Sequence, residues 1–236
     1  SRHIHDPLLE RITVLTALVD DLSTAEKSKR HDIAAQLKPL LHDTVSWLYT
    51  CPPFCYCESQ GAYEDLEHAL SEERLDRDYE EGEAHLPYLA LSSCEPILRI
   101  LVAIYNFCLL IRTFEMKYLR GLKRRNADAF AKAAHECFDE DDSFLILLEQ
   151  MPFGGVEEFF SYPRVITGFN YFQDENDEEK WKTAQRVICK RAIDFYVFDL
   201  MNGLHHGHAP SQCQGCGRYF LTTNGHIPKY CDGVAP

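Results

Sequence analysis

Hydrophobic residues recur at helical spacing along most of the chain. Residues 7–22 place leucine, isoleucine and valine every three or four positions, which predicts an amphipathic helix with Pro7 in its first turn. The same spacing predicts a helix over 25–49 that Thr24 caps and that Pro39 kinks or divides. The longest periodic run predicts a helix over 95–120, which begins at Glu95-Pro96 and ends at Gly121.

The pattern continues to be helical beyond Gly121, with one interruption. Three further helices are predicted, each with a capping or terminating residue: 127–138 after Asn126, 144–150 after Asp142 or Ser143, and 176–202 before Gly203. Residues 156–173 are aromatic and irregular, which indicates either a short strand pair or a loop packed by its rings. The chain is therefore predicted to be mainly α, with a helical bundle-like body.

Composition predicts a folded protein with a packed core and without a membrane span. The chain has 236 residues, of which 45% are hydrophobic and 12% aromatic, so it can bury a core and is not intrinsically disordered. The most apolar stretch, residues 96–114, contains Arg99, Asn106 and Arg112, which favours a buried core helix over a membrane span. The chain begins with Ser1, and we expect it to be part of a longer protein; no secretory signal pattern is present.

The cysteines and the charges restrict the setting and the partners. Several of the ten cysteines, such as Cys94, Cys108 and Cys189, stand singly in apolar runs, which indicates buried thiols and a reducing, cytoplasmic environment. The formal net charge is −13, and residues 51–100 alone carry −9, so the protein as a whole is repelled by phosphate backbones. Residues 201–236 carry +1, so any nucleic-acid contact is expected to be local to this end.

The carboxyl end carries the spacing of a metal site. Cys213 and Cys216 form a Cys-x2-Cys pair, and Gly217 follows where the chain must reverse with a positive φ. Residues 218–220 then begin a strand, Asn224-Gly225 predicts a hairpin turn, and residues 227–230 return Cys231 to the first two cysteines. This arrangement predicts a zinc ribbon or treble-clef-like β-hairpin finger with structural Zn²⁺.

Tetrahedral zinc needs a fourth ligand, and three alternatives remain. His226 lies between the second and third cysteines, near the expected hairpin tip. His205, His206 and His208 precede the finger, where they are also suited to the end of a helix. We favour a third alternative, a cysteine soon after Pro236, which makes the finger segment a truncated one.

The same residues carry a family resemblance. The stretch CQGCGRYF, followed by KYCD, resembles the carboxyl-terminal finger of a bacterial family described as a domain of unknown function. It is more distantly similar to CGNR-type zinc fingers, which follow a helical domain and are thought to regulate transcription through DNA contact. The resemblance covers residues 211–236 and implies that Cys213, Cys216 and Cys231 are ligands; the CGNR tetrapeptide itself is absent.

Other clusters are explained more simply by ordinary structure. Three cysteines lie close together in CPPFCYC, at a spacing typical of a packed loop: Cys51, Cys55 and Cys57. The basic residues of 117–125 match a helix end, and the acidic segment 58–84 matches a solvated, partly helical face. Signatures of metalloproteases, nucleotide-binding loops, nucleophile elbows and dinucleotide folds are absent, which disfavours an enzyme.

These patterns give a working hypothesis for domains and function. We expect a helical domain over 1–203 and a zinc-finger segment over 204–236. The finger is expected to present five side chains to a nucleic acid, DNA first: Arg218, Tyr219, Thr222, Thr223 and Lys229. The alternative is a protein–protein adaptor that meets a basic partner through 58–84, and an enzyme with its site in the helical body ranks third. No membrane association is expected, and the pattern leaves the oligomeric state open.

Overall fold

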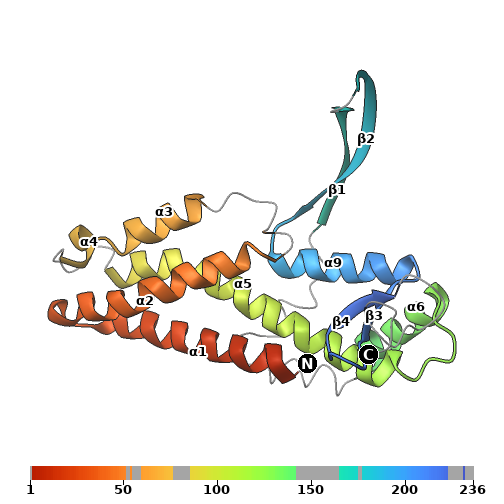
Figure 1. Ribbon diagram of the computed structural model, residues 1–236, viewed down its shortest axis with the longest axis horizontal. Helices are drawn as coiled ribbons and strands as arrows, with labels where there is room; N and C mark the ends of the chain where they lie inside the picture. The colour runs from red at the N-terminus through yellow and green to blue at the C-terminus, as the bar shows by residue number, and fades with distance from the viewer. Residues whose placement is uncertain are drawn as a thin grey trace. The chain divides into compact units, whose positions relative to one another are not determined.

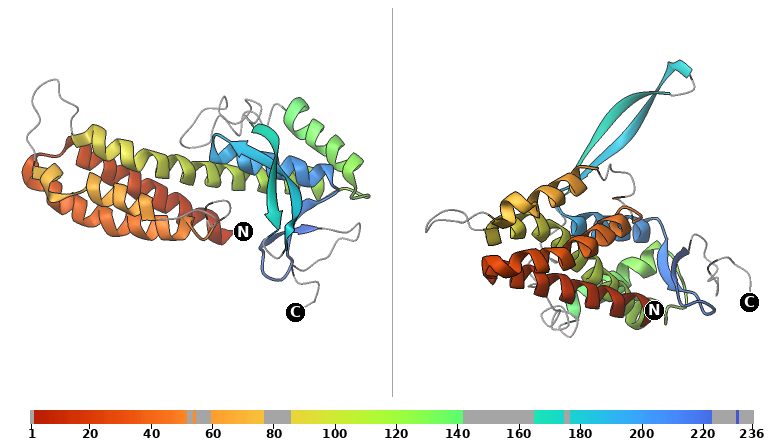
Figure 2. Two further views of the ribbon diagram at one scale, coloured as in Figure 1. Left: turned by 90° about the horizontal axis from the view of Figure 1, so that it is seen from above. Right: turned by 60° about the vertical axis from the view of Figure 1, so that its left-hand side comes forward.

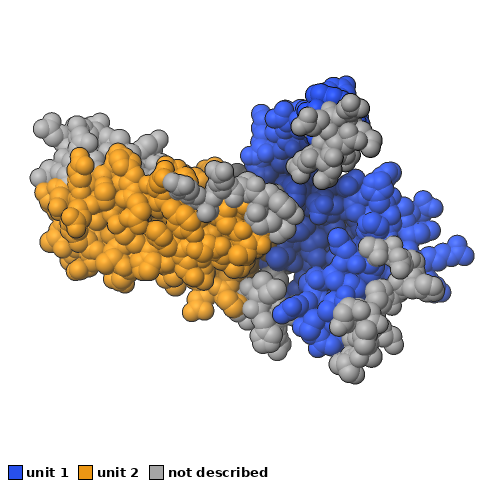
Figure 3. Space-filling view, turned by 45° about the horizontal axis from the view of Figure 1, so that its top comes forward, with its two compact units in different colours: residues 1, 106–236 blue, residues 2–105 orange. Residues whose placement is uncertain are grey.

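The computed structural model describes residues 2–51, 54, 60–76, 86–141, 165–174, 177–222 and 231. The chain forms two compact units, the N-terminal unit (residues 2–105) and the C-terminal unit (residues 106–236) (Figure 3). The division falls inside the long helix α5 (Leu86–Phe114). The described residues are mainly helical, with antiparallel β-hairpins near the carboxyl end, which confirms the predicted mainly-α class, while the zinc ribbon or treble clef stays a prediction. The predicted division into 1–203 and 204–236 stays a prediction.

Two helices form an antiparallel hairpin in the N-terminal unit, α1 (Arg2–Thr24) and α2 (Lys27–Leu48) (Figure 1). Their periodic apolar residues are buried, as the spacing predicts: Leu8, Ile12, Leu15, Val19 and Leu22 from α1, and Leu37, Leu41, Val45 and Leu48 from α2. Arg11 ties the two helices together, with hydrogen bonds to Asp43 at 2.6 Å and Thr44 at 3.1 Å. The short helices α3 (Gln60–Ala69) and α4 (Glu72–Asp76) pack against α2.

One expected helix signal in this unit, the Thr24 cap, is wrong, and of the two effects expected of Pro39 the division of the helix is excluded while a kink stays a prediction. Thr24 does not cap α2; it ends α1, where its hydroxyl donates to the Asp20 carbonyl at 3.1 Å. The N-cap of α2 is Glu26, without a side-chain cap bond. Pro39 lies inside α2 and does not divide it. The burial of Leu37 and Leu41 on either side of Pro39 supplies packing that offsets the lost backbone hydrogen bond.

Helices from distant parts of the sequence enclose the core of the C-terminal unit. α5 continues into a π-helical turn, η2 (Glu115–Leu119), and α6 (Ala127–His135) continues into a second, η3 (Glu136–Glu140). Residues from these elements, from α9 (Ala192–His205) and from the start of β3 (Ala209–Gln212) form one apolar cluster: Leu110, Phe114, Leu119, Phe130, Ala133, Cys137, Leu200, Leu204 and Ala209. Ala209 links this cluster to the strand that precedes Cys213.

The helix boundaries in this region match the sequence pattern in part. α5 begins at Leu86 and not at Glu95, so Pro96 lies inside the helix and does not start it. Asn126 caps α6 as predicted, because its Oδ1 accepts a hydrogen bond from the Ala129 N–H at 3.0 Å. The helix predicted over 144–150 lies outside the described residues.

A long antiparallel ribbon replaces the first half of the predicted helix 176–202. β1 (Val165–Asp174) pairs with β2 (Asp177–Cys189), and α9 begins only at Ala192 (Figure 2). The prediction was wrong because the acidic residues at 177–179 resemble a helix start, whereas the β-branched and aromatic residues that follow favour a strand once β1 is available to pair with them. Of the strand pair expected as one alternative within 156–173, one strand is found, over 165–173; its partner lies at 177–189, and 156–164 are outside the described residues.

The second hairpin carries the cysteine pair. β3 (Ala209–Gln212) pairs antiparallel with β4 (Tyr219–Thr222). The strand predicted from Arg218 to Phe220 is therefore confirmed in β4, while β3 was not anticipated. The expected Asn224-Gly225 turn and the return strand 227–230 lie outside the described residues.

One described helical stretch, Cys94–Leu119, is long and apolar enough to cross a membrane, with a mean hydropathy of 1.8. A single such stretch is weak evidence for a membrane span, because the core helix of a soluble protein passes the same test. This stretch supplies Leu110, Phe114 and Leu119 to the core of the C-terminal unit, and it also carries the buried polar side chains of Asn106 and Glu115.

Candidate metal centre

The turn between β3 and β4 holds Cys213 and Cys216 in a tight knuckle. The Cys213 N–H donates to the Arg218 carbonyl at 2.8 Å, and the Gly217 N–H donates to the Cys213 carbonyl at 3.0 Å. Gly217 has a φ of 71°, in the left-handed region that favours glycine, as its place after the second cysteine predicts. The side-chain amide of Gln212 donates to the Gly217 carbonyl at 3.0 Å and closes the turn from outside.

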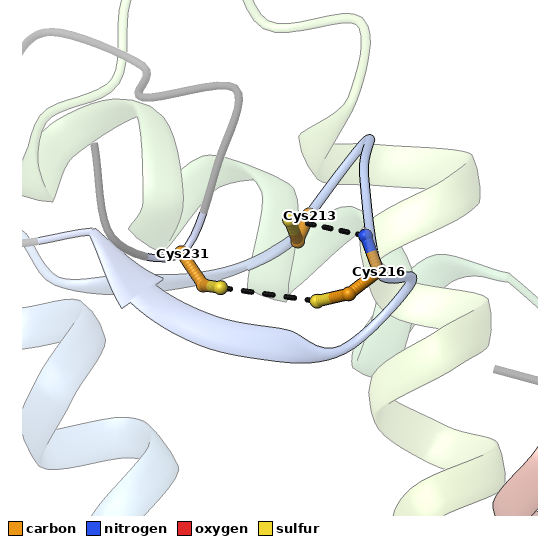
Figure 4. Close-up of side chains that lie close together, drawn as sticks. All are labelled: Cys213, Cys216 and Cys231. Atoms are coloured by element: carbon orange, nitrogen blue, oxygen red, sulfur yellow. Dashed lines mark hydrogen bonds between the residues drawn. The ribbon is translucent and has the colours of Figure 1, made fainter. Parts of the chain in front are cut away.

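Cys231 completes a group of three thiols (Figure 4). The Sγ atoms of Cys213, Cys216 and Cys231 all lie within 4.8 Å of one another, although Cys231 is fifteen residues beyond Cys216. The Sγ atoms of Cys216 and Cys231 are 3.8 Å apart. A disulfide needs about 2.05 Å, whereas two thiolates on a tetrahedral zinc ion, with Zn–S bonds of about 2.3 Å, lie about 3.8 Å apart. The group could hold a metal ion.

Hydrogen bonds within the group of three thiols lower the pKa of Cys213 and raise the pKa of Cys231. The Cys216 N–H points at the Cys213 Sγ from 3.5 Å, and this bond is the main cause that lowers the pKa of Cys213 to about 6. The pKa of Cys231 rises to about 11, because its thiol is hydrogen-bonded to the Cys216 and Cys213 side chains. One thiolate therefore forms readily, and a shared cation would allow the others to ionise beside it.

Side chains from the segment after α5 fasten the finger hairpin to the helices. Arg125 donates to the Pro210 carbonyl at 3.2 Å, and Arg120 reaches the side-chain carbonyl of Gln212 at 3.5 Å. Arg120 also pairs with the buried carboxylate of Glu115 at 3.3 Å. Within the hairpin, the buried Thr222 hydroxyl donates to the Ala209 carbonyl at 3.1 Å. These hydrogen bonds hold the β3–β4 hairpin, and with it the turn of Cys213 and Cys216, against the rest of the C-terminal unit.

Sequence reasoning did not find these fastening residues. It explained the basic segment 117–125 by a helix dipole and nearby acids, which Lys117–Asp141 and Arg120–Glu115 support in part. The contacts of Arg120 and Arg125 with β3 span 92 and 85 residues, so no local pattern carries them. The one available signal was a glutamate, Glu115, within an apolar helix, since a buried carboxylate usually has a basic partner.

The alternatives for the fourth ligand divide by where they lie. His226 lies outside the described residues, so it stays a prediction. His205, His206 and His208 are described and do not join the group of three thiols. α9 ends at His205, two residues beyond the predicted end at Gly203, and Gly207 then has a φ of 78°. These histidines therefore belong to the end of the helix and the turn that enters β3.

The side chains expected to meet a nucleic acid differ in exposure. Arg218 is exposed on the finger turn, and Thr223 and Lys229 lie outside the described residues. Tyr219 is half-buried, and its hydroxyl is buried with no hydrogen-bond partner among the described residues; burial, and then the charge of Glu115, raises its pKa. Thr222 is 2% exposed, so the prediction that it faces a partner is wrong, because its hydroxyl is used within the hairpin.

The other clusters of the sequence show no second metal group among the described residues. Cys51 is half-buried at the end of α2, and Cys55 and Cys57 lie outside the described residues. In the acidic segment 58–84, two carboxylates are engaged within the N-terminal unit: Glu67 with Lys38 and His42, and Asp76 with His31. These ion pairs reduce the charge that this segment offers to a partner.

Residues 161–236 match the model of a family of unknown function, DUF6076. This segment contains the ribbon, α9 and all three clustered cysteines. The resemblance of the finger to an uncharacterised family is therefore confirmed at that level, and its relation to zinc fingers of the CGNR type stays a prediction. No curated protein and no solved structure matches the chain.

Proposed function

We propose that the chain is a cytoplasmic regulatory protein that binds nucleic acid, and that Cys213, Cys216 and Cys231 hold a structural zinc ion. The observation that carries the proposal is the meeting of three thiols with a basic segment on one hairpin. The thiols supply a metal site, and the basic segment supplies groups that attract phosphate. Each half has its own support and its own test.

The donor set supports zinc. Thiolate ligands select soft or borderline metals, and a Cys-x2-Cys pair with a distant third cysteine is typical of structural zinc sites. The 3.8 Å separation of the Cys216 and Cys231 sulfurs fits tetrahedral Zn–S geometry. The remaining coordination position would go to His226 or to another ligand outside the group of three thiols. A metal at this place stabilises a turn that has no core of its own, on the order of 10 kcal/mol for small zinc-dependent folds.

The contacts at β3 support a nucleic-acid face. Arg120 and Arg125 bring the segment between η2 and α6 against the finger hairpin, and two further basic residues of that segment, Lys123 and Arg124, are exposed. Arg218 is exposed on the finger itself. These three exposed basic side chains lie on the hairpin and on the segment that contacts it, in a chain whose net charge is −13. Phosphate contacts confined to these side chains are compatible with overall repulsion, because salt limits repulsion to about 10 Å.

The zinc half is tested by metal content and by one pair of matched variants. Full-length protein purified without chelator is expected to contain one zinc ion per chain, measured by inductively coupled plasma mass spectrometry. Cys216→Ser should lose this ion, whereas Cys189→Ser, the same change at a cysteine outside the group, should keep it. Equal zinc content in the two variants would overturn the assignment.

The nucleic-acid half is tested by fluorescence anisotropy on a labelled DNA duplex at several salt concentrations. The Lys123→Glu/Arg124→Glu double variant and Arg218→Ala are expected to weaken binding, and the salt slope should fall by about one for each phosphate group that the variant no longer binds. Lys29→Glu, on an exposed face of α2, is the control for a change of net charge. Binding that is weak, insensitive to salt and equal in all variants would end this half of the proposal while leaving the zinc site intact.

A further inference from the structure

Where its strands pair in regular register, over 165–173 and 181–189, the β1–β2 ribbon has one face without a charged residue. Residues paired across an antiparallel ribbon share a face, and successive residues alternate between faces. The strand pairing, Val165 with Cys189 through Gln173 with Trp181, therefore places the odd-numbered residues of 165–173 and 181–189 together. We call this the uncharged face. The even-numbered positions carry Lys182 and Arg186 and form the opposite face.

The uncharged face displays large aromatic side chains. Phe169 is 74% exposed, Tyr171 is 73% exposed and Trp181 is 67% exposed. Aromatic side chains normally bury most of their surface, and a monomeric protein rarely displays several of them together. The ribbon extends away from α9 (Figure 1, Figure 2), and among the described residues each strand pairs only with the other. A two-stranded ribbon in water is marginally stable, so a partner that covers this face would stabilise it.

The charges along the ribbon identify the kind of partner. The end far from α9 carries four acidic strand positions, Asp174, Asp177, Glu178 and Glu179, against two basic ones, Lys180 and Lys182, so it is acidic on balance. The end near α9 carries Arg186 and is followed by the exposed Lys190. Two ribbons stacked in opposite directions place each acidic end beside a basic end, whereas two ribbons stacked in the same direction place like charges together.

We propose that the uncharged face is the contact between two copies of this chain, packed face to face about a two-fold axis with the ribbons antiparallel. A two-fold contact is self-complementary, so an aromatic face without charges can meet its own copy without burying an unpaired charge. A nucleic-acid strand fits this face poorly, because stacking platforms for bases lie in positively charged grooves and this face has no cation. The acidic end of the ribbon would also repel phosphate.

The expected contact is small. Three aromatic side chains with these exposures bury about 800 Å² over two copies when covered, and the other positions of the face add to this area. Specific interfaces begin at about 1,000 Å² in total, so the dimer is expected to be reversible, in the micromolar range. Its dissociation is therefore measurable by dilution.

Sedimentation equilibrium of the full chain, with two neighbouring substitutions, tests the proposal. Phe169→Glu places a charge on the uncharged face, whereas Asn170→Glu places the same charge on the next residue of the strand, on the opposite face. We expect the wild-type chain to dimerise, Phe169→Glu to weaken dimerisation about thirty-fold or more, as for a buried aromatic at the centre of an interface, and Asn170→Glu to dimerise normally. The proposal is overturned if the wild-type chain is monomeric at every concentration of a 100-fold dilution series that starts at about 1 mM, or if the two substitutions have equal effects. Circular dichroism shows whether Phe169→Glu is folded. Phe169→Ser removes the same aromatic ring without adding a charge, so it serves as a second test if the charged variant misfolds.

Charge exchange tests the antiparallel arrangement. Glu179→Lys and Lys190→Glu should each weaken the dimer at low salt, and the double variant should recover it, because the exchange restores opposite charges across the contact. Double-variant dimerisation no better than that of the single variants would exclude this arrangement.

Trp181 provides a local readout, since the chain has only one other tryptophan, Trp47. In a Trp47→Phe background, emission should shift to shorter wavelength with rising protein concentration as Trp181 becomes covered. Emission that stays at the exposed position while the chain dimerises would show that the contact lies elsewhere and overturn the proposal. A shift that instead follows added single-stranded DNA or anionic lipid vesicles, with the chain monomeric, would assign the face to that partner.

Discussion

Cys213 differs from the other two clustered thiols in its surroundings. It is 5% exposed at the end of β3, whereas Cys216 and Cys231 are exposed. Cys94 and Cys137 differ again, because each is fully buried in an apolar environment. Desolvation disfavours the thiolate and raises the pKa of Cys94 to about 11 and that of Cys137 to about 12. The chain therefore contains thiols of one chemical type with very different reactivities.

Alkylation should separate these thiols. In metal-free native protein, iodoacetamide is expected to modify Cys216 within minutes and the equally accessible Cys231 more slowly, because hydrogen bonds raise the pKa of Cys231 to about 11. Cys94 and Cys137 should stay unmodified for hours, because burial removes access as well as the reactive thiolate. Zinc should protect Cys216 and Cys231. Peptide mass spectrometry gives the extent at each site, and labelling in denaturant provides the control. Modification of Cys137 as fast as Cys216 would contradict the burial of this residue.

In this protein the sequence predicts the buried faces of helices better than it predicts the residues that cap them. The apolar rows of α1 and α2 are buried as their spacing predicts, since an amphipathic helix has only one way to remove such a row from water. Caps are less predictable: Asn126 caps α6, whereas Thr24, an equally suitable residue type, bonds back into α1. A cap depends on where the chain turns, and the turn is set by packing on both sides of it.

Removal of the α6 cap should have a measurable cost. Asn126→Ala leaves the Ala129 N–H without its side-chain acceptor and is expected to lower the free energy of unfolding by about 1 kcal/mol. Asn126→Asp should keep most of the stability, because a carboxylate accepts the same hydrogen bond and favours the helix N-terminus. Urea denaturation of the three proteins gives the comparison. An alanine variant as stable as the aspartate variant would show that this cap contributes nothing.

The contact between α2 and α3 should make the N-terminal unit sensitive to acid. Glu67 accepts from Lys38 at 3.2 Å and lies 2.8 Å from His42, and these bonds lower its pKa below the ordinary value of 4.5. A lowered folded-state pKa gives stability that is complete above about pH 4.5 and is lost as the pH falls below it through the folded-state value. Since the pair is largely exposed, its contribution is about 0.2–1 kcal/mol.

Glu67→Gln tests this pH dependence. The variant should be less stable than the wild-type chain at neutral pH and should lose less stability between pH 5 and pH 3, measured by urea denaturation at each pH. Asp65→Asn, a neighbouring exposed acid on α3, is the matched control and should keep the wild-type slope. Identical slopes for Glu67→Gln and the wild-type chain would show that the Lys38 and His42 contacts do not persist in solution.

The division into two units predicts a local effect of metal. The three thiols and their fastening residues all belong to the C-terminal unit, while α1 to α4 belong to the N-terminal unit. Local opening free energies differ between such regions, so removal of a structural ion should open the region that the ion holds. The effect on the whole chain should therefore be uneven.

Hydrogen exchange with and without chelator tests this expectation. Chelation should raise amide exchange in residues 209–222 by at least ten-fold, because the hydrogen bonds of β3 with β4 then open more often. Exchange in α1 and α2 should stay unchanged, and added zinc should restore protection of the hairpin. Equal deprotection of both units, or none in 209–222, would contradict a structural metal at the three cysteines.

The sequence by itself determined the local features of this protein. The helical rows, the Asn126 cap, the positive φ of Gly217 and the strand after Arg218 depend on residues within a few positions of one another, so their physical causes are visible in the pattern. The knuckle of Cys213 and Cys216 belongs to the same class, because Cys-x2-Cys defines its own turn.

Tertiary structure decided what depends on distant partners. Residues 177–189 can form a helix or a strand, and pairing with β1 selected the strand, because β-pairing is a contact between segments and not a property of one segment. In the same way, nothing near Arg120 or Arg125 in the sequence indicates their acceptors in β3. Arg120 donates to the side-chain carbonyl of Gln212, and Arg125 donates to the backbone carbonyl of Pro210. The free energy of such contacts arises only when two distant pieces of chain meet, and no local spacing records it.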